Sequence, residues 1–284
     1  MHTLEHPVLG PLRLGVSRLE SSREFFGLLL GLGLRDTPEG LEIRLPSGAT
    51  LATLEERPGA LPDSPALPGL YHLALKVPHR PALARILLRL REAGWPLEGP
   101  VDHGVSEALY LEGPEELGLE IYRDHSREAW PTRGGHLAMG SRLVPEGDLL
   151  AQAEEGTGTP DLEEGHLHLR VSDLRRSVSF YTSLLPLRVT QEDYPGAAFL
   201  AFGDYHHHLG LNVWSSQGSV PRTQERSGLI EISFLFRTSE SFRTWEEERD
   251  CRGLLEPRDR APDGSWVLFR DPDGWDVRVR RPLD

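Results

Sequence analysis

Short runs in which apolar and polar residues alternate recur along the chain, and each is followed by an amphipathic segment. Residues 165–171 read Gly-His-Leu-His-Leu-Arg-Val, and residues 172–185 then carry apolar positions three and four apart. Alternation with a period of two predicts a strand, whereas apolar residues at i, i+3 and i+4 predict a helix. The same strand-then-helix pattern begins near residues 10, 70, 165 and 229.

Each of these four strand–helix segments is followed by enough residues for three more strands. Turn sequences such as Asp271-Pro-Asp-Gly274 separate the later strands. The chain therefore predicts an α+β fold of four βαβββ modules. We expect a first domain at residues 7–125 and a second at 164–284, with residues 126–163 as the linker. The modules themselves are expected at residues 7–57, 69–125, 164–216 and 227–284.

Composition narrows the class of protein. The formal charge is −13, with 44 acidic against 31 basic side chains, which disfavours general binding to nucleic acid or to anionic membranes. No apolar run reaches the 18 or more residues of a membrane helix, and the first residues do not resemble a secretory signal, so a cytoplasmic location is expected. The single cysteine excludes an intramolecular disulfide and a cysteine zinc cluster.

Several sequence segments resemble those of a known protein family. The four βαβββ modules, with strand motifs such as residues 166–174 followed by residues 177–181, resemble the vicinal oxygen chelate superfamily, which includes glyoxalase I, bleomycin-resistance proteins and extradiol dioxygenases. Residues 102–110 and 203–212 are similar to its bacterial catechol 2,3-dioxygenase-like branch. The resemblance covers nearly the whole chain, and it implies two domains with curved, barrel-like mixed sheets.

The resemblance also implies where metal ligands lie, namely at the start of a module's first strand and on its last strand. The first-strand positions hold Pro11, His72, His166 and Glu231, and the last-strand positions that align clearly hold Glu120 and Arg278. Pooling His72, Glu120 and His166 gives two histidines and one carboxylate, the set that suits non-heme Fe(II) and leaves positions open for substrate and dioxygen. This set requires modules two and three to meet, or two chains to share a site.

Alternatives remain open for individual ligands. His168 shares a strand face with His166 and competes with it for the ligand role, because side chains two residues apart point the same way. Glu120 lies between Leu119 and Ile121, so the same alternation also allows its side chain to face solvent.

Further residues fit the catalytic accessories of the related dioxygenases. His103 follows the first ligand by 31 residues, and Tyr110 precedes Glu120 by 10. The tyrosine hydroxyl is expected to bind a deprotonated substrate oxygen, and the histidine to take a catechol proton and return it. His206 and His208 are alternative candidates for that base, or for stabilising an oxygen anion; alternation places both on one strand face and His207 on the other.

The sequence thus predicts an extradiol ring-cleavage dioxygenase that uses Fe(II), or Mn(II), with a small aromatic diol and dioxygen as its partners and with self-association allowed. One alternative is a glyoxalase-type lyase or isomerase with Zn(II) or Ni(II). Another is a metal-free protein of the same fold that binds a small aromatic compound, which the positions held by Pro11 and Arg278 favour because neither residue binds a metal there.

Overall fold

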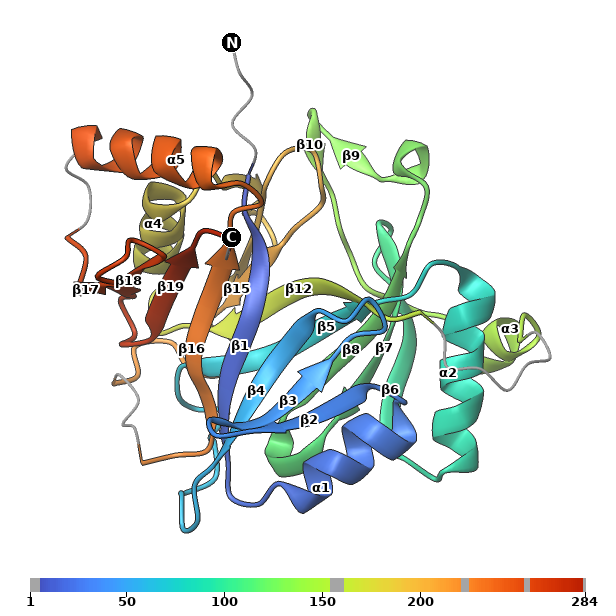
Figure 1. Cartoon of the computed structure of the whole chain (residues 1–284). Coiled ribbons are helices and arrows are strands. Elements are labelled where there is room, and N and C mark those ends of the chain that lie inside the picture. The colour runs from blue at the N-terminus through green and yellow to red at the C-terminus, as the bar shows by residue number, and fades with distance from the viewer. Residues whose placement is uncertain (1–5, 154–160, 221–224, 253–255, 283–284) are drawn as a thin grey trace.

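The computed structural model describes residues 6–153, 161–220, 225–252 and 256–282 (Figure 1). Its strands form two large mixed sheets. The nine-stranded sheet has the order β11 (Arg142–Leu143), β6 (Leu97–Asp102), β7 (Ser106–Glu112), β8 (Gly118–Asp124), β5 (Gly69–Lys76), β12 (Glu163–Arg170), β15 (Leu209–Asn212), β14 (Ala197–Ala201) and β13 (Arg188–Gln191). This sheet contains the strands of modules two and three.

The eight-stranded sheet contains the strands of modules one and four. Its order is β17 (Asp259–Arg260), β18 (Trp266–Arg270), β19 (Asp276–Arg280), β16 (Gly228–Leu235), β1 (Val8–Val16), β4 (Thr50–Glu56), β3 (Gly40–Arg44) and β2 (Gly33–Thr37). The two remaining strands, β9 (Thr132–Arg133) and β10 (His136–Leu137), form a separate hairpin.

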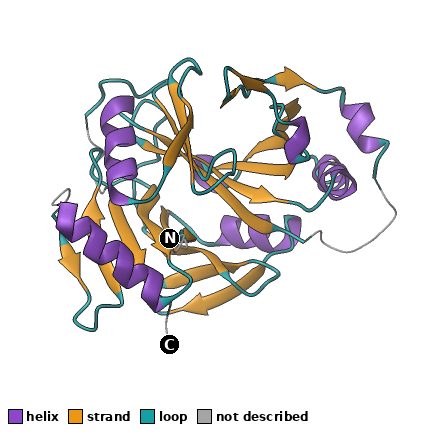
Figure 2. Ribbon diagram, turned by 90° about the horizontal axis from the view of Figure 1, so that it is seen from above, coloured by secondary structure: helices purple, strands orange, loops and turns teal. Residues whose placement is uncertain are grey.

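Helices lie outside the sheets, with α4 (Leu174–Leu184) and α5 (Ser239–Arg252) at one side and α2 (Arg80–Glu92) and α3 (Glu146–Leu150) at the other (Figures 1 and 2). The helical segment that follows β1 is short and irregular, because the single turn α1 (Glu20–Ser22) continues as the π-helical segment η1 (Arg23–Leu29). Two 3₁₀ turns, η2 (Pro114–Glu116) and η3 (Arg127–Ala129), flank β8.

Local sequence explains where the regular helices begin. His79 precedes α2 in an extended conformation and its ring nitrogen accepts the Ala82 amide at 3.2 Å, while Pro81 occupies the first turn, where its missing amide proton costs nothing. Asp173 caps α4 in the same way by accepting the Arg176 amide at 3.0 Å. Each cap thus satisfies one of the amides that a helix leaves unpaired in its first turn.

The predicted α+β fold with two large mixed sheets is confirmed. In hydrogen-bond order each sheet runs from one edge strand to another, so within the described residues neither sheet closes into the expected barrel. One continuous hydrophobic core joins the sheets, including Leu12 of β1, Leu73 of β5 and Phe234 of β16. No helix of the described chain is both long enough and apolar enough to span a bilayer.

The modules do not pair in chain order. β1 pairs antiparallel with β16, and β5 pairs antiparallel with β12, so module one joins module four and module two joins module three. Each sheet thus combines one module from each expected domain, and the expected boundaries at residues 125 and 164 stay a prediction. This pairing sets the functional geometry, because it brings the first strands of modules two and three side by side.

A buried carboxyl beside α4 gives a pH prediction for the fold. Asp271 accepts the Trp275 amide at 2.8 Å and the Tyr181 hydroxyl at 3.0 Å, and burial raises the pKa of its carboxyl to about 7. The folded protein therefore holds a proton between about pH 4 and pH 7 that the unfolded chain releases, so this group's contribution to stability falls as pH rises through that window.

We expect Asp271→Asn to reduce the loss of stability between pH 5 and pH 8, because the amide does not ionise. Urea unfolding midpoints of the wild type and the variant at both pH values measure this difference. Equal changes in midpoint for the two proteins would contradict the assignment.

Candidate metal centre

Three adjacent strands of the nine-stranded sheet alternate leucine or isoleucine with polar residues. On β8, Leu119 and Ile121 enter the hydrophobic core and Glu120 faces the other way; on β12, Leu167 enters the core and His166 faces the other way. Because side chains alternate along a strand, this pattern gives the sheet one apolar face and one face of buried polar groups. β5 lies between β8 and β12 and adds His72 to the polar face.

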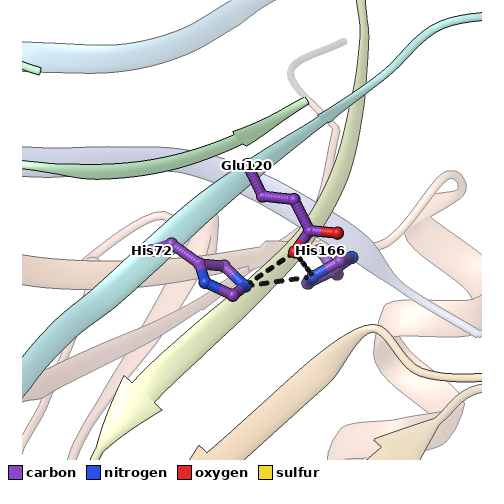
Figure 3. A group of neighbouring side chains, drawn as sticks. All are labelled: His72, Glu120 and His166. Atoms are coloured by element: carbon purple, nitrogen blue, oxygen red, sulfur yellow. Dashed lines mark hydrogen bonds and ion pairs between the residues drawn. The ribbon is translucent and has the colours of Figure 1, made fainter. Parts of the chain in front are cut away.

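These three polar side chains converge (Figure 3). The Nε2 atoms of His72 and His166 lie 3.0 Å and 3.1 Å from Oε2 of Glu120, and 3.3 Å from each other. All three residues are buried, with Glu120 only 2% exposed. The structure therefore places modules two and three together within one chain, and it removes the solvent-facing alternative for Glu120.

The donor set fits a divalent metal ion. Ligands about 2.1 Å from an ion and at right angles to each other are about 3 Å apart, which is the spacing of these three atoms. Without an ion, both imidazoles would have to donate to one carboxylate oxygen while their Nε2 atoms face each other at 3.3 Å. Such a contact between two N–H groups is unfavourable, so the geometry suits an ion better than a hydrogen-bonded cluster.

Electrostatics keep the carboxylate ready to bind a cation. Burial by itself would raise the pKa of Glu120, but the charges and hydrogen bonds of His166 and His72 outweigh burial and hold this pKa well below its usual value. Burial lowers the pKa of His166, which favours the neutral imidazole that a metal requires. Among the described residues, this is the group of histidines and acids whose ligand atoms lie close enough to hold an ion.

His168, the competing ligand candidate, has a different partner. It lies opposite His72 in the β5–β12 register, and its Nε2 receives a hydrogen bond from the side-chain amide of Asn212 at 3.2 Å. Burial lowers its pKa well below the usual value, so the ring is neutral. Its ring stands at 87° to that of His72, with 4.9 Å between the centroids, so it packs beside the ligand.

The equivalent positions of modules one and four form an ion pair instead of a second ligand set. The Arg278 guanidinium donates to both carboxylate oxygens of Glu231 at 2.8 Å and 2.5 Å, and Arg280 adds a third contact to Glu231 at 3.2 Å. Pro11 contributes its backbone oxygen to the Ser233 hydroxyl at 2.8 Å. These modules therefore complete the fold without adding ligands.

The two accessory residues of module two form a hydrogen-bonded pair. Nε2 of His103 lies 2.7 Å from the Tyr110 hydroxyl, and its Nδ1 lies 2.8 Å from the Gly140 carbonyl oxygen. A carbonyl only accepts, so Nδ1 carries the proton and Nε2 accepts the proton of Tyr110. Burial and the nearby Glu120 charge raise the pKa of Tyr110 well above its usual value, which keeps its hydroxyl protonated.

A cavity of about 690 Å³ lies against the polar face of the sheet. It is lined by all three candidate ligands, by the His103–Tyr110 pair and by apolar and aromatic side chains that include Leu97, Val105, Met139 and Phe199. Substrate-sized cavities with a few polar groups at one end are typical of small-molecule sites. The ligand set therefore has space for a substrate beside it.

The histidine run at residues 206–208 is arranged differently from the expectation. It lies in a bend before β15 begins, so the strand alternation does not apply. His206 is fully buried with its Nε2 2.9 Å from Asp124, and His208 accepts the Phe202 amide at 3.2 Å; neither lines the cavity. Their catalytic roles remain predictions: both lie outside the cavity lining, and the ring centroid of His206 is 6.4 Å from that of His166.

Strand alternation predicts that the side chain of His207 lies on the face opposite to those of His206 and His208. In the structure His207 lines the cavity, and its ring centroid is 4.1 Å from that of His166. Its Nδ1 lies 2.7 Å from Nδ1 of His206. Burial lowers the pKa of His207 well below its usual value, so its ring is neutral and carries one donor and one acceptor nitrogen. Of residues 206–208, His207 is therefore the one that the structure brings to the cavity.

Comparisons with known proteins identify a matching family model and relatives of this chain. The model of the Glyoxalase/Bleomycin resistance protein/Dioxygenase superfamily matches residues 165–279. The chain is 38% identical over 230 residues to the catechol-2,3-dioxygenase of Bacillus subtilis strain 168, covering 78% of this chain and 80% of that protein. It is also 30% identical over 112 residues to the metallothiol transferase FosB of Staphylococcus saprophyticus, covering 38% of this chain and 70% of that protein.

Solved structures share the fold at low sequence identity. A candidate dioxygenase from Bacillus subtilis strain 168 superposes with a TM-score of 0.67 at 14% identity, covering 99% of this chain and 86% of that one. Glyoxalase I from Zea mays superposes with a TM-score of 0.57 at 17% identity, covering 97% and 92% of the two chains. At these identities the likeness concerns the fold alone.

Proposed function

This chain belongs to the glyoxalase/bleomycin resistance protein/dioxygenase superfamily, and we propose from that premise that it is an extradiol dioxygenase that cleaves a catechol-type aromatic ring. The observation that carries the proposal is the buried group of His72, Glu120 and His166 at the wall of a cavity. Two histidines and one carboxylate are the donor set of non-heme Fe(II) oxygenases. The relative from Bacillus subtilis, a catechol-2,3-dioxygenase, supports the same activity.

Fe(II) is the ion that this proposal assigns to the three ligands, with Mn(II) as the other ion that fits the same chemistry. When bound, it supplies the redox chemistry that allows dioxygen to react with the ring. The carbon–carbon bond beside one hydroxyl breaks, and both oxygen atoms of dioxygen enter the ring-opened semialdehyde-type product. Atoms and electrons balance without an external reductant, because the diol itself is oxidised.

Side chains of the protein donate and accept the protons of the reaction. The high pKa of Tyr110 keeps its hydroxyl protonated, and substrate binding turns this proton from Nε2 of His103 toward a substrate oxygen beside the ligand set, which favours a deprotonated oxygen there. This turn frees Nε2 of His103, whose Nδ1 is held by the Gly140 carbonyl, to take the proton of a substrate hydroxyl and return it during ring opening. His207 adds a second neutral imidazole at the cavity wall.

Incorporation of both atoms of dioxygen tests the activity. With catechol and ¹⁸O₂ we expect one dioxygen consumed per diol and a product heavier by two ¹⁸O atoms. Zn(II) or Ni(II) protein that acts on a substrate without consuming dioxygen would instead support the glyoxalase-type lyase or isomerase. A cytoplasmic location and self-association stay predictions that this experiment does not address.

A further inference from the structure

The cavity beside the ligand set is much larger than one aromatic ring requires. A cavity of about 150 Å³ holds a benzene molecule, whereas this cavity measures about 690 Å³. The three ligands and the His103–Tyr110 pair lie along one part of its lining. A single-ring diol held there leaves most of the cavity unfilled.

An aromatic wall continues outward from the ligands. The ring of Tyr71 lies 5.2 Å from that of His72 and 5.2 Å from that of Trp214, and Tyr194 follows at 6.4 Å from Trp214. Tyr71 and Trp214 are 39% and 45% exposed, although both line the cavity. Large aromatic side chains left open to water beside a buried site favour contact with an apolar ligand group.

A β-bulge in β5 brings the side chain of Tyr71 into this aromatic wall. The β5–β12 pairing matches His168 with His72 but Leu169 with Leu70, so Tyr71 is an extra residue in a bulge. Consecutive residues normally point to opposite faces of a sheet, and the bulge lets both Tyr71 and His72 line the cavity. The Tyr71 carbonyl oxygen also approaches Gly118 so closely that a Cβ there would lie 2.0 Å from it, which requires glycine.

Charge around the cavity disfavours acidic substituents. Three exposed carboxylates, those of Glu98, Glu112 and Glu116, line it, and their side chains form no hydrogen bond or ion pair with the rest of the described chain. The one arginine in the lining, Arg170, already donates to Asp63 at 2.6 Å and to the backbone oxygens of residues 67 and 70. An acidic substituent would meet repulsion there without a free cation.

We propose that Tyr71, Trp214 and Tyr194 form an aromatic subsite for a second ring, so that the preferred substrates are catechols that carry an aryl substituent and no acidic group. This inference rests on the proposed ring-cleavage function, which it deepens by naming the substrate class. The second ring lies against the aromatic wall while the diol reaches the ligands.

Steady-state kinetics with the Fe(II)-loaded protein compare catechol with 3-phenylcatechol. We expect kcat/KM for 3-phenylcatechol to exceed that for catechol at least about tenfold, because burying a second ring adds hydrophobic and aromatic contacts. Trp214→Leu and Tyr71→Leu are each expected to lower that ratio about tenfold, mostly through KM for the phenyl compound. Trp266→Leu is the matched control, because Trp266 packs against Arg278 in the other sheet and is not part of the cavity lining.

A binding measurement separates this inference from the proposed function. Calorimetry under anaerobic conditions measures the affinity for 3-phenylcatechol without turnover, and we expect Trp214→Leu to weaken it about tenfold. If catechol is cleaved but the phenyl group gives no advantage in kinetics or in binding, the subsite is wrong and the proposed function stands. If neither diol is cleaved, the proposed function fails, and binding that depends on Trp214 still upholds the subsite.

Charged substrates complete the test. 3,4-Dihydroxybenzoate is expected to be a poorer substrate than catechol, and Glu98→Gln to reduce the difference by weakening the repulsion. 2-(3,4-Dihydroxyphenyl)ethylamine tests the opposite preference, because carboxylates beside aromatic rings also suit an ammonium group. A kcat/KM for the amine above that for 3-phenylcatechol would overturn the aryl assignment.

Discussion

Glu120→Ala is expected to abolish ring cleavage and to weaken Fe(II) binding at least about a hundredfold, because even residues that merely support metal ligands cost 10- to 100-fold when replaced. Its Oε2 lies 3.0 Å and 3.1 Å from the Nε2 atoms of the two histidine candidates, so its loss leaves two ligands instead of three. The fold itself should survive, since the change also removes the cost of burying a carboxylate. Metal analysis after gel filtration, with oxygen uptake on adding catechol, measures both effects.

The matched control for this variant is Glu107→Gln. Glu107 is also a buried carboxylate in the same sheet, but it pairs with Arg80 and Arg123 at 2.9 Å and does not line the cavity. We expect Glu107→Gln to lower the unfolding temperature while the folded protein keeps its metal and activity. Retention of both metal and activity by Glu120→Ala would show that the ligand assignment is wrong.

His103→Gln is expected to lower kcat about a hundredfold or more while metal content stays unchanged, because general acid–base catalysis contributes about 10²- to 10⁴-fold. Glutamine still offers an acceptor to the Tyr110 hydroxyl, which lies 2.7 Å from Nε2 of the histidine, but it cannot exchange protons in this role.

His125→Gln serves as the control, since His125 belongs to the same module, contacts Asp102 at 3.0 Å and does not line the cavity. We expect it to leave kcat and metal content as in the wild type. Tyr110→Phe completes the set, because it removes the donor and keeps His103. An unchanged kcat in both His103→Gln and Tyr110→Phe would remove this pair from the mechanism.

The residue pattern along the chain predicts which residues are the ligands better than it predicts which modules pair with each other. Alternation along β8 and β12 places Glu120 and His166 opposite the core-facing leucines of their own strands, whatever the partners of these strands are. Which module pairs with which depends on contacts between strands about 90 residues apart, such as His72 opposite His168. Local periodicity holds no information about such pairing, and only the need for three ligands indicated that modules two and three meet.

Two local irregularities account for the remaining differences. Residues 206–208 lie in a bend and not in a strand, so the alternation that placed His206 and His208 together does not hold, and His207 lines the cavity instead. The bulge at Tyr71 likewise turns two consecutive residues toward the cavity. Bulges and bends of this kind are common beside active sites, where they redirect single side chains that a period-two pattern assigns to the opposite face.

Metal content and oxygen uptake, measured in one sample of anaerobically purified protein reconstituted with Fe(II), test the central claim most directly. We predict close to one iron per chain and dioxygen consumption that begins when catechol is added. Folded protein that binds no iron under these conditions would contradict the metal centre built from His72, Glu120 and His166, and iron-loaded protein that consumes no dioxygen with any catechol would contradict the ring-cleavage function.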